Sequence, residues 1–249
     1  MIRQSFIFLD KINYKTEKNI RLQTNDWNKF LQTKKIKGLS EKRKIFYNQK
    51  IREASNALIN YDSSYFRNMK ETWRLYNYFK EDAIFIDIEI SRNYKDITVI
   101  GLFDGIDTKI MVKNFNLDKN LLKNELLKYK LIITFNGGSF DLPAIKKYFK
   151  DTFPPIPHID LRHLCARIGL KKGLKNIEKE LGIERPNIIK DLYGGDPALL
   201  WRKFMATGNN RFLELLVEYN EEDIINLKKI TDYTIQKLSS EFMEFKELN

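Results

Sequence analysis

Residues 83–89 read Ala-Ile-Phe-Ile-Asp-Ile-Glu, an apolar run in which two carboxylates stand two positions apart. A short apolar run with polar residues on both sides is typical of a fully buried β-strand. Side chains alternate between the faces of a strand, so Asp87 and Glu89 point the same way, roughly 6–7 Å apart. Two buried anions are costly unless a cation neutralises them, and oxygen ligands favour Mg²⁺ or Mn²⁺. The alternative is a strand end at which both carboxylates are hydrated, and this stretch alone does not exclude it.

The segments after this strand predict an α/β fold. Apolar runs and short polar connections, one of them around Asn93, indicate three antiparallel strands, a helix, another buried strand and a second helix. The expected ranges are 83–89, 96–104 and 108–112 for the three strands, then 117–129, 130–135 and 141–149. This order resembles the ribonuclease H-like fold, a mixed sheet of three antiparallel strands and then parallel strands, flanked by helices.

A second motif lies where the strand over 130–135 turns into the next helix. Residues 134–143 read Thr-Phe-Asn-Gly-Gly-Ser-Phe-Asp-Leu-Pro. Ligands of α/β folds gather at the carboxyl ends of strands, and the two glycines permit a tight turn that a substrate backbone can approach. Asp141 is therefore expected to face the neighbouring strand that carries Asp87. The alternative is that Asp141 caps its own helix.

A third motif lies on a helix near the end of the sequence. Residues 217–227 carry apolar side chains at helical spacing. Tyr219 and Asp223 are four positions apart, so they share one face of that helix. A metal held together with Asp87 and Glu89 gives an inward-facing Asp223 a partner. The alternative, an exposed acidic helix, fits the neighbouring glutamates better than it fits Asp223.

The composition limits the class of protein. With 249 residues, 43% of them hydrophobic, the chain can bury one sizeable core. Its apolar stretches are shorter than the roughly 20 residues of a membrane helix, and the first ten residues lack the pattern of a signal peptide. Cys165, the single cysteine, excludes an internal disulfide and is expected to be a small core residue. Two histidines are too few for a zinc site built on several imidazoles. A cytoplasmic protein is predicted.

The net charge of +11 is unevenly distributed along the chain. Residues 1–80 hold 18 Lys and Arg against 7 Asp and Glu, whereas residues 81–249 hold 26 of each class. The basic segment suits a polyanion such as nucleic acid; the alternative is a solvated surface in a Lys-rich chain. We expect a basic, mainly helical N-terminal region over 1–80, packed as a layer on a ribonuclease H-like domain over 81–249.

Apolar residues at helical spacing predict helices over 40–60 and 65–79 in the N-terminal region. In the first helix, Ile45 and Phe46 belong to the predicted buried stripe. The aromatic residues of the second helix either stack on bases or form core, and the core is favoured. The segment 5–9 is expected to be a short strand or a packed tail.

The three carboxylate motifs, in this order, resemble those of a known family. Asp87-x-Glu89, the segment 136–141 and Tyr219-x-x-x-Asp223 resemble the three exonuclease motifs of the DEDD superfamily of 3′–5′ exonucleases. The Tyr-x-x-x-Asp spacing resembles its tyrosine branch, which includes bacterial polymerase proofreading domains and ribonuclease D. The pattern Phe-Asn-x-x-x-Phe-Asp-Leu-Pro is closest to the YprB-like ribonuclease H-like domain, and it also resembles family B polymerase proofreading domains. Similarity to YprB-like proteins extends to 5–9, 27–31, 73–76, 158–161 and 181–183.

Two departures from the YprB-like pattern concern particular residues. Proteins of that family often have His where this chain has Tyr219. They also tend to have a Gly-rich turn near the N-terminus that resembles a helix-hairpin-helix, a motif that grips a nucleic-acid backbone. Here that place, residues 9–16, contains no glycine, and the first glycine of the chain is Gly38. The resemblance therefore does not extend to a backbone-amide grip.

The resemblance implies a metal-dependent 3′–5′ exonuclease that acts on single-stranded 3′ ends of DNA or RNA by a two-metal mechanism, with two Mg²⁺ or Mn²⁺ ions. It implies that Asp87, Glu89, Asp141 and Asp223 are metal ligands and, with Tyr219, the catalytic residues. Asp87 is then the ligand shared by both ions, and Asp141 acts mainly through water. Tyr219 orients the attacking water, because an unperturbed phenol is a poor general base.

Three further residues of these motifs have two interpretations each. Asn136 and Phe140 are implied to contact the terminal nucleotide, and the alternative for Phe140 is a core anchor. Asp160 precedes an expected helix over 161–168, where N-capping is favoured over a role towards substrate.

Two other functions compete with the exonuclease. One is a catalytically silent nucleic-acid-binding protein, which is expected to lose at least one of the four carboxylates; all four are present. The other is a structure-specific endonuclease on the same fold. The residues do not distinguish DNA from RNA, nor do they identify a protein partner or an oligomeric state.

Overall fold

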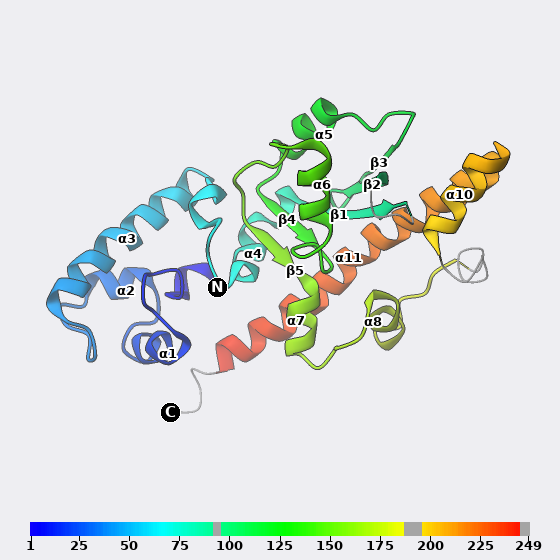
Figure 1. The fold of residues 1–249 in the computed structure, drawn as a ribbon. Helices are drawn as coiled ribbons and strands as arrows, with labels where there is room; N and C mark the ends of the chain where they lie inside the picture. Colours follow the sequence, from blue (N-terminus) through cyan, green and yellow to red (C-terminus); the bar gives the residue numbers. More distant parts are fainter. Residues whose placement is uncertain (92–95, 187–195, 245–249) are drawn as a thin grey trace. The chain divides into compact units, whose positions relative to one another are not determined.

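The computed structural model describes residues 1–91, 96–186 and 196–244 (Figure 1). Contacts along the chain divide it into two compact units. The helical unit consists of residues 1–80, 155–157 and 235–249, and the sheet unit consists of residues 81–154 and 158–234. The expected division into domains over 1–80 and 81–249 stays a prediction. Among the described residues, no helix is both long and apolar enough to cross a membrane.

The sheet unit is built on five strands in the order β3-β2-β1-β4-β5. β1 pairs with β2, and β2 with β3, in antiparallel fashion, whereas β1–β4 and β4–β5 are parallel. The strands are β1 (Ala83–Ile90), β2 (Ile97–Phe103), β3 (Thr108–Val112), β4 (Leu131–Thr134) and β5 (His158–Asp160). The mixed ribonuclease H-like sheet predicted from the sequence is confirmed. The expected connection around Asn93 lies outside the described residues.

Helices flank this sheet. They are α5 (Lys119–Leu126), α6 (Asp141–Phe149), α7 (Leu161–Arg167), α8 (Leu174–Glu180), α10 (Pro197–Thr207) and α11 (Asn210–Glu244). Asp118, Asp160 and Asp196 accept hydrogen bonds from the first-turn N–H groups of α5, α7 and α10, as N-capping carboxylates do. The predicted helices over 117–129, 141–149 and 161–168 are confirmed within a few residues.

Two of these helices bury the edge of the sheet. Trp201 and Leu200 of α10 and Leu215 and Leu216 of α11 form one buried cluster with Val99 of β2 and its neighbour on β3. Cys165 of α7 is fully buried, with its Sγ 3.4 Å from Thr234 Oγ1 of α11, which confirms the predicted core cysteine. α11 is thus fixed to the sheet along the length that contains residues 217–227.

The helical unit contains α1 (Tyr14–Gln23), α2 (Trp27–Gln32), α3 (Glu41–Ile59) and the short α4 (Tyr76–Phe79). Single 3-10 turns cover Ile2–Gln4, Ser63–Phe66 and Thr72–Leu75, and a further one, Lys80–Asp82, leads into β1 of the sheet unit. The segment 5–9 is a packed tail rather than a strand. Phe6 and Ile7 donate their N–H groups to Glu17 Oε1 at 2.6 and 2.9 Å, and Arg74 Nη1 lies 2.7 Å from the same oxygen.

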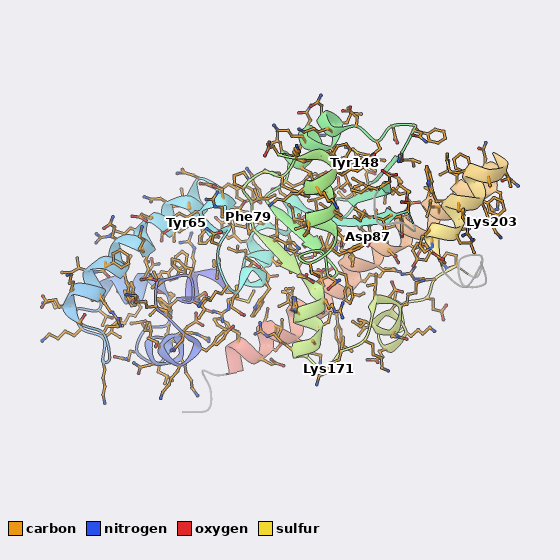
Figure 2. The ribbon with its side chains drawn as sticks, in the orientation of Figure 1. Tyr65, Phe79, Asp87, Tyr148, Lys171 and Lys203 are labelled. Atoms are coloured by element: carbon orange, nitrogen blue, oxygen red, sulfur yellow. The ribbon has the colours of Figure 1, made fainter. Side chains whose placement is uncertain are left out.

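The predicted helix over 65–79 is wrong. Two 3-10 turns and the four-residue α4 take its place. Glu71 and Arg74 are buried, and each has polar partners: Tyr14 Oη donates to Glu71 Oε1 at 2.5 Å, and Arg74 pairs with Glu17. The bonds of Glu71 and Arg74 to these distant partners accompany the break in the helix predicted over 65–79. The preference for core over base stacking is confirmed, because Phe66, Trp73 and Phe79 are 0–2% exposed; Figure 2 labels Phe79.

The predicted buried stripe of α3 is wrong at Ile45 and Phe46, which are 65% and 43% exposed. Lys44 and Tyr47 are buried instead. Lys44 Nζ lies 4.4 Å from the centroid of the Phe30 ring, over which its aliphatic stem can pack. The rest of the predicted stripe is confirmed, because Ile51, Ala54, Ala57 and Leu58 are buried. The error is confined to the first turns of the helix, where apolar residues lie on several sides and the sequence alone does not indicate which side is buried.

Candidate metal centre and active site

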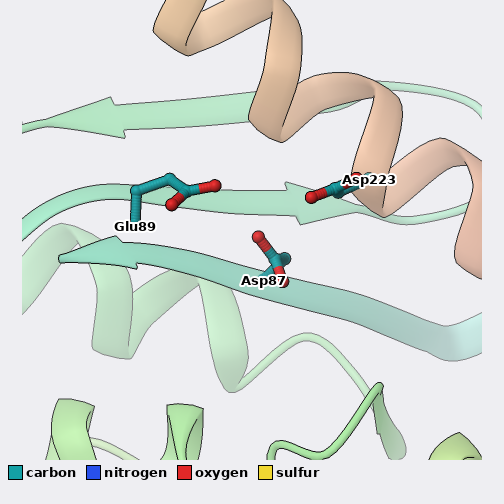
Figure 3. Close-up of side chains that lie close together, drawn as sticks. All are labelled: Asp87, Glu89 and Asp223. Atoms are coloured by element: carbon teal, nitrogen blue, oxygen red, sulfur yellow. The ribbon is translucent and has the colours of Figure 1, made fainter. Parts of the chain in front are cut away.

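Three carboxylates converge in the sheet unit (Figure 3). Asp87 and Glu89 lie on the central strand β1, and Asp223 comes from α11. One oxygen from each side chain lies within 4.8 Å of the other two. Asp223 is 6% exposed, so it is not part of an exposed acidic face. The structure therefore brings together three of the four metal ligands expected from the sequence.

Asp87 is held by a contact between the sheet and α11. Its register partner on β2 is Gly101. Asn220 of α11 donates from Nδ2 to Asp87 Oδ2 at 2.9 Å. A Cβ atom at Gly101 would lie 2.1 Å from Asn220 Oδ1, so glycine is required for this approach. Sequence reasoning assigned no role to Asn220, although its position three residues before Asp223 places both on one helix face.

Asp141 lies beside this cluster but outside the set of three. It is the first residue of α6, after the N-cap Phe140, and is 3% exposed. Its Oδ1 accepts a hydrogen bond from the backbone N–H of Ile88 at 3.1 Å. Ile88 separates Asp87 from Glu89 in β1. The predicted orientation of Asp141 towards this strand is confirmed, and the alternative of a helix cap is wrong, because the side chain bonds to β1 instead.

The electrostatics of the cluster favour a bound cation. Burial raises the pKa of Asp87 and of Glu89 well above the ordinary value, and the charges of Asp223 and Asp141 raise both further. Burial also raises the pKa of Asp141 to about 7 and that of Asp223 to about 6. A divalent cation among these oxygens would offset both the burial cost and the mutual repulsion. The donor set, carboxylate oxygens alone, is the one that Mg²⁺ and Mn²⁺ prefer.

One oxygen of Asp223 already has a cationic partner. Arg185 donates from Nε and Nη2 to the two oxygens of Glu178 at 2.7 and 2.6 Å, and Nη2 also donates to Asp223 Oδ1. Asn226 donates to Glu178 Oε1 at 3.2 Å. Sequence reasoning missed Arg185 and Glu178, because neither lies in a carboxylate motif. Among the described residues, the bond to Arg185 leaves the second oxygen of Asp223 for a metal.

Tyr219 lies on α11, one turn before Asp223. Burial raises the pKa of its phenol far above the ordinary value, and the charges of Asp223 and Glu89 act in the same direction. The phenol is therefore protonated at neutral pH, and it can donate a hydrogen bond but cannot act as a base. Lys175 Nζ of α8 lies 4.4 Å from the centroid of its ring. Sequence reasoning did not identify Lys175.

The turn after β4 is held by Asp160. Asn136 adopts a left-handed backbone with φ of 66°. The N–H groups of Asn136 and Gly138 donate to Asp160 Oδ1 and Oδ2 at 2.8 and 3.1 Å, and Arg162 N–H donates to Oδ1 at 3.1 Å. The predicted N-cap role of Asp160 is confirmed. Phe140 is 37% exposed, so the alternative of a core anchor is wrong.

Comparison with known proteins identifies the family. A model of the RNase H superfamily matches residues 84–235. The chain is also similar to the crystal structure of Escherichia coli RNase D, described as an exoribonuclease involved in structured RNA processing. The identity is 18% and the TM-score 0.42, over 71% of this chain and 48% of that one, so the protein spans about half the length of RNase D. No curated protein matches the chain. The family match supports a nuclease, a hydrolase that acts on nucleic acid. Because residues 84–235 are more than half of the 249, the chain belongs to the RNase H superfamily.

Proposed function

We propose that the protein is a metal-dependent 3′–5′ exonuclease that hydrolyses phosphodiester bonds at single-stranded 3′ ends of DNA or RNA. The observation that supports this proposal is the convergence of Asp87, Glu89 and Asp223 within 4.8 Å on the sheet of an RNase H superfamily protein. The neighbouring Asp141, bonded to β1 at Ile88, completes the four carboxylates of a DEDD site.

The four carboxylates would hold two Mg²⁺ or Mn²⁺ ions. Bound ions would supply an activated water and stabilise the attacking and leaving oxygens of an in-line displacement. Asn220 orients Asp87 through the bond at 2.9 Å, and Arg185 orients Asp223. A carboxylate whose rotamer is fixed in this way needs less reorganisation when the metal ion binds.

Tyr219 and the turn after β4 act on the water and the substrate. The protonated phenol of Tyr219 donates a hydrogen bond, which is how it would orient the attacking water. Phe140 directly precedes Asp141 and exposes 37% of its surface, so its ring is available to stack on the terminal base. The Asn136 side chain lies on the same turn, with Oδ1 accepting from Ser139 Oγ at 3.1 Å, and its amide N–H₂ can donate to the terminal nucleotide.

The test uses 5′-labelled single-stranded DNA and RNA of one sequence, with Mg²⁺, with Mn²⁺ and with chelator. We expect a metal-dependent ladder that shortens from the 3′ end. Asp87→Asn, which keeps an acceptor for Asn220, should abolish it. Asp107→Asn is the matched control, because Asp107 is an exposed carboxylate in the turn between β2 and β3 and should leave the rate unchanged.

Two results contradict the exonuclease. Cleavage of a circular single strand would identify an endonuclease, because a circle has no 3′ end. A substrate that stays intact while shifting in a binding gel would identify a silent binding protein. A separate outcome concerns the metal centre: if Asp87→Asn and Asp107→Asn lost activity equally, Asp87 would not be a specific metal ligand.

A further inference from the structure

Two cations lie beside the carboxylate cluster, and they differ in how their donors are used. The Arg185 side chain is 8% exposed, and its Nε and Nη2 donate to Glu178 and Asp223. Lys175 makes neither a hydrogen bond nor an ion pair with any described residue, and its Nζ lies over the face of Tyr219, 4.4 Å from the ring centroid. Arg185 therefore uses Nε and Nη2 within the protein, whereas the three N–H donors of Lys175 have no acceptor in the described part of the chain.

The packing of α8 fixes where Lys175 lies. Gly173 precedes the helix, and Ile177 and Glu178 anchor it with 0% and 2% exposure. Glu178 is in turn held by Arg185 and by Asn226 of α11. Lys175 is three residues before Glu178, so the two share one face of the helix. The same anchor that joins α8 to α11 therefore places the ammonium over Tyr219 while the Lys175 side chain stays exposed to solvent.

Lys175 also lies within the electrostatic field of the metal ligands. Burial lowers the pKa of Lys175, while the charges of Asp223 and Glu89 raise it and that of Arg185 lowers it. Because Lys175 is exposed, lies over the ring of Tyr219 and forms an ion pair with neither carboxylate among the described residues, it stands at the rim of the site. Once a metal neutralises the carboxylates, their attraction for Lys175 weakens and its charge is available to an anion.

We propose that Lys175 is a further catalytic residue, which binds the non-bridging oxygens of the phosphodiester that is cut. This inference rests on the proposed nuclease function and adds the group that receives the phosphate. A compact ammonium on a flexible stem suits phosphate as a point charge. Its contact with the Tyr219 ring limits the conformations that must be ordered when substrate binds. Negative charge develops on the phosphate oxygens in the transition state, and it strengthens the contact between these oxygens and the ammonium of Lys175.

The test compares Lys175→Met, Lys175→Arg and the control Lys179→Met. Lys179 lies one turn further along α8, is exposed and has no ion pair with a described residue. Binding of a labelled single strand is measured by fluorescence anisotropy in Ca²⁺ at several salt concentrations, with a gel to show that the strand stays intact. One phosphate contact changes the slope of log K against log salt by about 0.7 for a single strand. Lys175→Met should lose this amount, whereas Lys175→Arg and Lys179→Met should keep it.

Two further readouts separate a phosphate contact from a structural role. With Mg²⁺, Lys175→Met should lower kcat/KM by about 10–100-fold, and Lys175→Arg should recover most of that loss. The affinity for Mn²⁺, measured by calorimetry without nucleic acid, should not fall in Lys175→Met, because a positive charge is removed from beside the metal. A weaker Mn²⁺ affinity, or a slope equal to that of the wild type, would overturn the proposal.

The binding slope separates this inference from the proposed function, because it requires no hydrolysis. If the wild type binds but does not cleave, the exonuclease is refuted and the slope of Lys175→Met still decides the role of Lys175. If the wild type cleaves and Lys175→Met cleaves equally fast, only the role of Lys175 is refuted. If the wild type neither binds nor cleaves, both are refuted.

Discussion

Replacing Asp87 with Asn should make the metal-free protein more stable at pH 8, although it removes a residue at the centre of the site. In chelator, burial and the neighbouring charges oppose ionisation of Asp87 in the folded protein, whereas the unfolded chain ionises it freely. The folded state therefore holds protons that the unfolded state has lost. Its stability falls as pH rises from about 4, and the loss is complete above the folded pKa.

The neighbouring carboxylates set the size of this effect. The pKa of Asp141 rises from 3.8 to about 7, and that of Asp223 from 3.8 to about 6. Shifts of this size correspond to about 3–4 kcal/mol per group. Since carboxylates in one cluster titrate as a set, we expect Asp87→Asn to gain about 3 kcal/mol at pH 8 and only about 1–2 kcal/mol at pH 5, little more than one pH unit above the pKa of the unfolded chain. For a chain of this length the gain corresponds to about 6–12 °C in Tm.

The assay is urea and thermal unfolding followed by circular dichroism in EDTA at pH 5 and pH 8. His158 acts in the opposite sense, because burial lowers its pKa to about 4 and its contribution is lost as pH falls below about 6.5. The difference between wild type and Asp87→Asn cancels that contribution, and Asp107→Asn should follow the wild type. With Mn²⁺ the wild type should become more stable than Asp87→Asn, because only the intact carboxylate cluster gains the free energy of metal binding. A less stable Asp87→Asn at pH 8 in EDTA would refute the reasoning.

Three other substitutions test the supports of the site. Tyr219→Phe should slow single-turnover hydrolysis about 10–100-fold without changing the Mn²⁺ affinity; an unchanged rate would make the phenol structural. Arg185→Met should cost about 3–5 kcal/mol in urea unfolding, because it leaves Glu178 buried without its main partner. The double variant with Glu178→Gln should recover much of that loss, and no recovery would contradict the pairing. Gly101→Ala should cost about 1–3 kcal/mol and weaken Mn²⁺ binding, because its Cβ displaces Asn220; wild-type stability and affinity would contradict the close approach of α11.

The sheet and the positions of Asp87, Glu89 and Asp223 on their elements were predictable because strong local patterns specify them. The strand over 83–89 is an uninterrupted apolar run, and its neighbours follow at short polar turns. The positions of Asp87 and Glu89 on one face follow from the period of a strand. Tyr219 and Asp223 share a helix face by the same kind of rule. These residues have side-chain directions that depend on secondary structure alone.

The remaining parts depend on contacts between distant segments. Asn220 acquires its role only because Gly101, on another element, leaves room for it. Arg185 lies in the segment after α8, where no period indicates its direction, and its partners come from two helices. The helix predicted over 65–79 failed for the same reason, since the polar partners of its buried residues are far away in the sequence. Local patterns carry no information about such partners.

The turn after β4 also controls the deamidation of Asn136. Asn136 is followed by Gly137, and an asparagine before glycine loses its side-chain amide fastest, because the next backbone nitrogen is unhindered and attacks the side chain. Here that nitrogen donates to Thr134 Oγ1 at 3.0 Å, and Asn136 Oδ1 accepts from Ser139 Oγ at 3.1 Å. The attacking nitrogen and the side-chain amide that it would attack are therefore both held by other partners. The rate at which Asn136 deamidates consequently depends on how often the turn opens. Each opening allows conversion of this residue into aspartate or isoaspartate.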